Sequence, residues 1–195
     1  KRIVKVYCLK LRQMSMGSNK EKHLDLIAAV REVRIVSRGD LFLRPGEISN
    51  RGYLVKSGCL KSYFLDETGK EHIMQFAPEG WLVSDMNGMV NSQPSSVFIE
   101  AIEESEVFLV EGKMEDYLAV DSDILMHRIT MLHNNVIALN RRIALLLSST
   151  AEERYQAFLD TYPALANRLS QKLIASFIGI TPEFLSQIRK KRTGK

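Results

Sequence analysis

Cysteine is scarce in this 195-residue chain, and its scarcity limits the possible chemistry. Only Cys8 and Cys59 are present, and they lie far apart in the sequence. Two thiols cannot build a framework of several disulfides or supply the four thiolates of an iron–sulfur cluster. We therefore expect two free thiols in a reducing compartment and no iron–sulfur cluster.

Long hydrophobic runs are also missing. No apolar run exceeds five residues, as in Ile143–Leu147, whereas a membrane-spanning helix needs about 18. The first 22 residues contain no sustained apolar stretch followed by small residues, so they do not resemble a signal peptide. The sequence predicts a cytoplasmic protein without membrane association.

Histidine is rare. His23, His72, His127 and His133 include no His-x-His pair, and only His72 lies among the strands predicted below. A cupin-type metalloenzyme needs several histidines and a carboxylate around one metal, and no Ser/His/Asp or Cys/His arrangement stands out. We therefore predict no metal site, no catalytic residues and no enzyme activity. A cupin-like metalloenzyme remains the alternative of another class.

Charge is unevenly distributed along the chain, although the net charge is only +4. Residues 46–125 carry 5 basic and 15 acidic side chains, whereas residues 151–195 carry 8 basic and 4 acidic ones. An acidic middle and a basic C-terminal part predict that a polyanion would meet the C-terminal part.

The stretch from Arg34 to Glu111 is typical of β structure. Short strand-like runs, such as "GYLV", "LKSYFL", "HIMQFA", "SVFIEAI" and "EVFLV", alternate with turn residues. Asp66–Lys70 is a good hairpin loop, because Gly69 can take the left-handed conformation. Many short strands separated by Gly and Pro predict a barrel or a jelly roll.

A long helix is predicted next, from a cap at Asp121 or Ser122 to about Ser148. Its apolar residues repeat at alternating intervals of four and three, which is typical of a coiled-coil seam: Leu125, Ile129, Leu132, Val136, Leu139, Ile143 and Leu146. The seam predicts pairing with a second helix, and therefore dimerisation. The alternative is a helix that packs on its own barrel. Both can hold if the flanking Met126, Ile137 and Leu147 face the barrel.

The last 45 residues are predicted to be helical and small. Ser149 or Thr150, with Glu152 or Glu153 three residues later, gives a capping box that opens a new helix. The chain then divides into a β-roll over residues 20–120, a long helix over 121–149 and a helical domain over 150–195. The fold class is α+β.

A helix-turn-helix is predicted within "QKLIASFIGITPEFLSQIRKKR". Ala175 is small where two helices cross, and Gly179 can end the first helix in the left-handed conformation. Thr181 can cap a second helix, with Pro182 in its first turn. This order of helix, glycine turn and capped helix is the DNA-binding motif.

Apolar Leu185 and Ile188 would hold the second helix against the first, which leaves the opposite face free to enter a major groove. Glu183 could accept a hydrogen bond from cytosine and Gln187 could bind adenine. The predicted base-reading residues are Pro182, Glu183, Ser186, Gln187 and Lys190. The predicted phosphate contacts, which position rather than specify, are Ser170, Lys172, Thr181, Arg189 and Lys191.

In this order, a β-roll, a long helix and a helix-turn-helix resemble the bacterial cyclic-AMP receptor/fumarate–nitrate regulator (CRP/FNR) family, especially members with a short C-terminal domain. The most specific resemblance lies in "RPGE" at Arg44–Glu47, in the hairpin series Gly52–Trp81 and in the helix-turn-helix. The resemblance implies a homodimeric transcription regulator. It would read two-fold related half-sites about 34 Å apart and contact RNA polymerase.

The resemblance also raises the question of an effector. Family members that bind cyclic nucleotides carry Gly-Glu for the ribose and Arg-Ser for the phosphate. Here Trp81 follows Gly80, and no arginine lies between Gly80 and Ile102. Without a guanidinium the phosphate loses its strongest partner, so we expect no cofactor and no cyclic-AMP binding by the usual contacts. A regulator that depends on a cyclic nucleotide or another small molecule bound in the β-roll remains the alternative, with a pocket at Gly80, Trp81, Leu82, Ser95 and Ser96.

Overall fold

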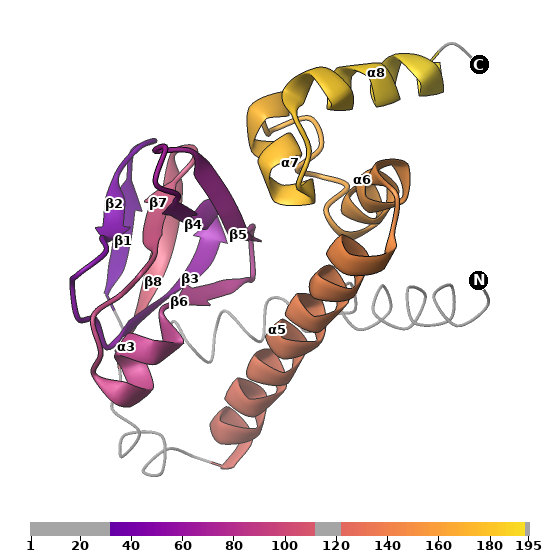
Figure 1. Cartoon of the computed structure of the whole chain (residues 1–195). Coiled ribbons are helices and arrows are strands. Elements are labelled where there is room, and N and C mark those ends of the chain that lie inside the picture. Colours follow the sequence, from indigo (N-terminus) through magenta and orange to yellow (C-terminus); the bar gives the residue numbers. More distant parts are fainter. Residues whose placement is uncertain (1–31, 112–121, 194–195) are drawn as a thin grey trace.

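The computed structural model describes residues 32–111 and 122–193. Its first part is a β-roll of two four-stranded antiparallel sheets (Figure 1). The strands are β1 (Val33–Val36), β2 (Leu41–Leu43), β3 (Arg51–Ser57), β4 (Leu60–Leu65), β5 (Glu71–Ala77), β6 (Leu82–Ser84), β7 (Phe98–Ala101) and β8 (Ser105–Glu111), with a short helix α3 (Met86–Asn91) before β7. The predicted jelly-roll class is confirmed.

The two sheets have the strand orders β1-β8-β3-β6 and β2-β7-β4-β5. Apolar side chains from both sheets fill the space between them, among them Val55, Leu60, Ile99 and Val107, each 0% exposed. Because successive side chains of a strand point to opposite faces, Leu60 of β4 lies in this core whereas Tyr63 faces outward to other partners. The outer face of the second sheet is therefore available for a further layer.

A glycine fixes the β3–β4 hairpin. Gly58 has φ of +87°, which side-chain-bearing residues rarely adopt. A Cβ atom there would also collide with the Glu104 carbonyl and with Ser105. Both the conformation and the close approach of the chain therefore require glycine at this turn.

Helix α5 (Ser122–Ser148) is a single long rod that leaves the β-roll and ends at the C-terminal helices (Figure 1). Its bounds confirm the predicted helix. Met126, Ile137 and Leu147 do not pack on the β-roll, because they are 60%, 44% and 82% exposed. The expectation that they face the barrel is wrong, since α5 contacts the β-roll through Arg142, which donates to the Ile73 carbonyl of β5.

Within residues 149–193, three helices follow α5: α6 (Ala151–Thr161), α7 (Gln171–Ile178) and α8 (Pro182–Thr193). The predicted capping box opens α6, where Thr150 Oγ1 accepts a hydrogen bond from the Glu153 amide and the Glu153 carboxylate accepts one from the Thr150 amide. Across the described ranges, no helix is both long and apolar enough to cross a membrane.

The C-terminal helices share one hydrophobic core with the outer face of the second sheet. Phe76 of β5 lies at the centre, with ring centroids 5.1 Å from Phe177, 6.3 Å from Tyr162 and 6.5 Å from Phe158. Ser176 of α7 adds polar contacts at the edge strand β5. Its hydroxyl accepts from the Ile73 amide at 3.2 Å and donates to the Glu71 carbonyl at 2.8 Å. A boundary near residue 150 thus separates the elements in sequence but not their cores.

Candidate nucleic-acid interface

The α7–turn–α8 segment has the geometry that its sequence predicts. Ala175 is fully buried, and Gly179 takes the left-handed conformation with φ of +71° while its amide donates to the Ala175 and Ser176 carbonyls. Leu185 and Ile188 are 0% and 2% exposed, so they fasten α8 to the core. The turn and this buried face fix how α8 is presented.

Helix α8 runs away from the β-roll at the top of the view, with its far side uncovered by any other drawn helix or strand (Figure 1). Glu183, Gln187 and Lys190 are exposed, whereas Pro182 and Ser186 are half-buried. Because residues four and seven positions apart share a helix face, Glu183, Gln187 and Lys190 form one continuous accessible strip. The five predicted base-reading residues therefore lie on one helix, and three of them are exposed.

The predicted phosphate contacts have more varied surroundings. Ser170 caps α7, where its hydroxyl accepts from the Leu173 amide at 3.3 Å. Thr181 caps α8, where its hydroxyl accepts from the Phe184 amide at 3.2 Å. Both residues thus place a helix N-terminus, with its unpaired amides, at the surface.

The basic residues among the predicted phosphate contacts differ in their exposure and in their contacts. Lys172 and Lys191 are exposed, whereas Arg189 is half-buried and its Nε donates to the Tyr155 hydroxyl at 2.9 Å. Arg189 therefore joins α8 to α6, a contact that the sequence reasoning missed. Arg192 was missed too. It lies 5.6 Å from the Tyr155 ring centroid and donates to Gln156 at 2.6 Å.

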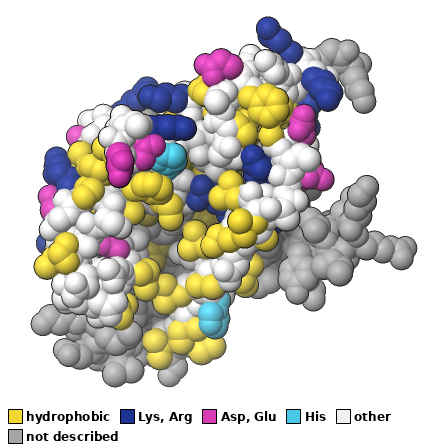
Figure 2. Space-filling view, viewed as in Figure 1, with side chains coloured by type: hydrophobic (Ala, Val, Ile, Leu, Met, Phe, Trp, Pro, Cys, Tyr) yellow, Lys and Arg dark blue, Asp and Glu magenta, His cyan; other side chains and the backbone are white. Residues whose placement is uncertain are grey.

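Charge along α8 favours both the helix and an anionic partner. Glu183 lies in the first turn, and Lys190, Lys191 and Arg192 lie in the last. This arrangement complements the helix dipole. Figure 2 shows Lys and Arg side chains at the top of the view, near the end of α8. Cations displayed on an exposed helix suit the phosphates that flank a groove.

The predicted effector-pocket residues have different surroundings. Trp81 lies 5.6 Å from the Tyr162 ring centroid and so belongs to the junction with the C-terminal helices. Leu82 is in β6, and Gly80 forms a turn with φ of +82°. Ser95 is buried, with its hydroxyl donating to the Val97 carbonyl at 3.0 Å, while Ser96 is exposed. The sequence reasoning missed that Trp81 serves the domain junction.

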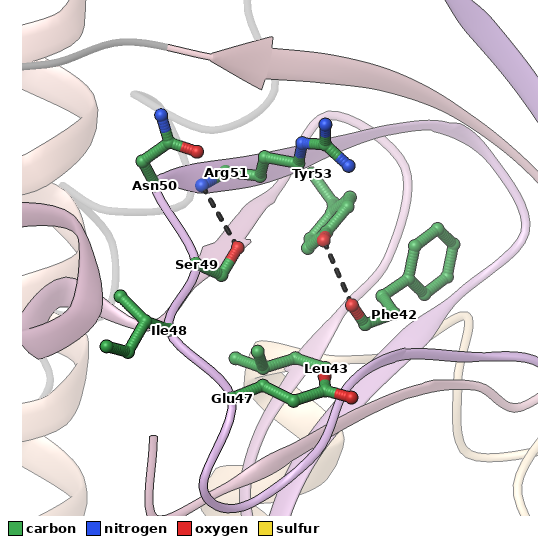
Figure 3. Close-up of a pocket in the computed structure, with 8 residues that line it drawn as sticks. All are labelled: Phe42, Leu43, Glu47, Ile48, Ser49, Asn50, Arg51 and Tyr53. Atoms are coloured by element: carbon green, nitrogen blue, oxygen red, sulfur yellow. Dashed lines mark hydrogen bonds between the residues drawn. The ribbon is translucent and has the colours of Figure 1, made fainter. Parts of the chain in front are cut away.

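An open hollow of about 480 Å³ lies elsewhere on the β-roll (Figure 3). The Tyr53 hydroxyl donates to the Phe42 carbonyl at 3.1 Å, and the Arg51 amide donates to Ser49 at 3.2 Å. The lining is mixed in character and includes none of the five predicted pocket residues: Phe42, Leu43, Glu47, Ile48, Ser49, Asn50, Arg51 and Tyr53. Over residues 32–111 and 122–193, no group of three His, Cys, Asp or Glu side chains could hold a metal ion.

The seam residues of α5 are accessible in the single chain. Val136, Leu139, Ile143 and Leu146 are 53%, 41%, 55% and 39% exposed. The remaining three, Leu125, Ile129 and Leu132, are half-buried. Apolar residues on one face of an exposed rod indicate a surface that a partner covers.

Comparison with known proteins agrees with this architecture. Residues 33–117 match the cyclic nucleotide-binding domain family. An anaerobic regulatory protein of Pasteurella multocida is 29% identical over 181 residues, which cover 86% of this chain and 66% of the relative. The fumarate and nitrate reduction regulatory protein of Vibrio cholerae is 29% identical over 184 residues, which cover 86% of this chain and 72% of the relative. The chain thus spans about two thirds of the length of the first of these relatives.

Solved structures show the same fold. FixK2 of Bradyrhizobium japonicum superposes with a TM-score of 0.68 at 22% identity, over 83% of this chain and 84% of that one. A CRP/FNR-family transcriptional regulator of Thermus thermophilus superposes with a TM-score of 0.64 at 19% identity, over 82% and 84% of the two chains. The sequence relatives and the solved structures agree with the CRP/FNR resemblance that the sequence motifs indicate. In sequence and in fold, the chain is similar to transcription regulators of the CRP/FNR family.

Proposed function

We propose that this protein binds DNA sequence-specifically as a homodimer and inserts α8 of each copy into a major groove. The observation that carries the proposal is the presentation of α8. Its inner face is buried through Leu185 and Ile188, while Glu183, Gln187 and Lys190 are exposed on the outer face. An α-helix fits the major groove, where carboxylate and amide side chains can discriminate bases by about 1–3 kcal/mol per pair.

The dimer is formed by α5. Two copies that pair along the seam would bury the exposed Val136, Leu139 and Ile143 against each other. At about 1.5 Å per residue, its 27 residues give a rod of roughly 40 Å, which is long enough for several heptads of contact. The two α8 helices of such a dimer would read half-sites about 34 Å apart, one turn of the duplex.

The proposed DNA binding does not require cyclic AMP as an effector. Between Gly80 and Ile102 the chain offers no guanidinium for a cyclic phosphate. Trp81 packs on Tyr162, and the Ser95 hydroxyl donates to the Val97 carbonyl. The proposed regulator therefore works without cyclic AMP bound by the usual contacts. It acts in the cytoplasm, is not an enzyme, and meets RNA polymerase as its resemblance to the family implies.

The proposed function is tested by selecting bound duplexes from a randomised pool with the full chain. We expect enrichment of a two-fold symmetric site. Gln187→Ala should then relax the preference at one position of each half-site. Lys191→Ala should weaken binding to all sequences alike and lower the salt slope by about one.

Lys70→Ala provides the matched control, because Lys70 is exposed but lies in the turn between β4 and β5. This variant should bind like the wild type. The base-reading role of α8 is wrong if Gln187→Ala weakens every sequence equally. The DNA-binding proposal itself is wrong if the wild type enriches no duplex.

A further inference from the structure

Phe184 is an aromatic residue at the surface of an otherwise polar helix face. It is the third residue of α8 and is 42% exposed, whereas its neighbour Leu185 is 0% exposed. Its amide is fixed by the bond to Thr181 Oγ1 at 3.2 Å, so the position of the residue at the helix start is well defined. In the helix-turn-helix geometry, the N-terminal residues of this second helix contact base edges.

Phe184 shares its side of α8 with Gln187 and Lys191. The three residues are spaced i, i+3 and i+7, which places them in one row on a helix. Gln187 and Lys191 are both exposed, as Phe184 is. The row therefore combines an apolar ring, an amide and a cation, ordered from the start of the helix toward its end.

Each member of this row has a natural counterpart in the major groove. An amide pairs with adenine, a cation with phosphate, and an aromatic ring with the C5 methyl group of thymine. Cβ atoms three residues apart on a helix are about 5–6 Å apart, while successive base pairs are about 3.4 Å apart. Phe184 and Gln187 would thus meet base pairs one or two steps apart.

We propose that Phe184 determines sequence specificity by packing against a thymine methyl group, one or two base pairs from the adenine bound by Gln187. This inference rests on the proposed function and deepens it, since it states which bases the site contains. The recognised half-site then carries A·T pairs at two nearby positions, one read through hydrogen bonds and the other through an apolar contact.

The test uses a duplex selected with the full-length wild-type protein, in which each thymine is replaced in turn by uracil, which lacks the C5 methyl group. Loss of one buried methyl contact should weaken wild-type binding about fourfold at one thymine per half-site. Phe184→Ala should weaken binding to the thymine duplex by a similar factor, and should bind the thymine and uracil duplexes equally. Gln187→Ala is the matched control, because it should keep the preference for thymine over uracil.

The outcomes separate the two proposals. If the wild type binds its selected duplex but shows no uracil effect at any thymine, the role of Phe184 is wrong while the DNA-binding function stands. The same conclusion follows if Phe184→Ala keeps the preference for thymine. Circular dichroism checks that Phe184→Ala folds, and Phe184→Leu gives a second variant that should keep part of the preference through its apolar side chain.

Discussion

Arg142 of α5 donates from Nη2 to the carbonyl oxygen of Ile73 in β5 at 2.6 Å. The same guanidinium donates to the carbonyls of Met74 at 2.6 Å and Phe177 at 3.1 Å, and it lies 4.3 Å from the Phe177 ring centroid. The side chain therefore joins the long helix, the edge strand of the β-roll and the first helix of the helix-turn-helix. Burial lowers the pKa of Arg142, but an arginine stays charged in proteins.

Removing this guanidinium should loosen all three elements at once. We expect Arg142→Met to lower the free energy of unfolding by about 2–4 kcal/mol, because three carbonyls at the junction lose a charged donor. Urea unfolding followed by circular dichroism measures the change. Arg142→Lys should lose less, since its ammonium keeps the charge but cannot reach three carbonyls in the same fork geometry.

Asn140→Ala is the control, because Asn140 is exposed on the same helix. If Arg142→Met unfolds at the same urea concentration as this control, the guanidinium contributes nothing to the junction.

A charge in the middle of the α5 seam should prevent dimerisation. Val136 is 53% exposed in the single chain and lies midway along the heptad pattern. Val136→Asp would place a carboxylate in a desolvated contact between two helices, at a cost of several kcal/mol. Light scattering should then give the mass of a monomer, where the wild type gives that of a dimer.

Asn140→Asp provides a matched control, since it introduces the same charge at an exposed position off the seam. This variant should keep the wild-type mass. A dimer mass for Val136→Asp would remove the seam as the contact between the two copies.

Cys59 should react as a buried, neutral thiol. Burial raises the pKa of its thiol to about 12, and the charge of Glu103 adds to this effect. In a Cys8→Ser background, where Cys59 is the single cysteine, the rate of iodoacetamide alkylation should rise about tenfold per pH unit between pH 9 and 11. An exposed thiol would instead level off near its ordinary value of about 8.5.

The raised pKa of Cys59 also makes the stability of the fold depend on pH. The folded state disfavours the Cys59 thiolate. The contribution of Cys59 to the free energy of unfolding is therefore complete below the pKa of this thiol in the unfolded chain, and it is lost as the pH rises toward about 12. Circular dichroism at each pH confirms that the fold persists during alkylation. A rate that levels off near pH 9 would contradict the neutral thiol.

Several helix bounds and turns could be predicted from the amino-acid sequence. The heptad pattern predicted α5, Thr150 and Glu153 predicted the start of α6, and Gly179 with Thr181 predicted the turn before α8. These features depend on backbone preferences and capping within a few residues, so the chain needs no distant partner to specify them.

Several roles depended on contacts between distant segments. Trp81, predicted to line an effector pocket, packs on Tyr162, which is 81 positions later in the sequence. The short strands β1, β2 and β6 and the helix α3 carry too few residues to show a periodic pattern, so they were not predicted individually.

The amino-acid sequence alone determined the order of the parts: a β-roll, a heptad helix and a helix-turn-helix, because alternation, heptad spacing and capping are encoded over short distances. Only the tertiary structure decided that the roll and the last three helices share one core, and that Arg142 and Ser176 satisfy the backbone of the edge strand β5. The physical reason is that such contacts depend on which surfaces meet when the whole chain minimises its exposed apolar area and its unpaired polar groups.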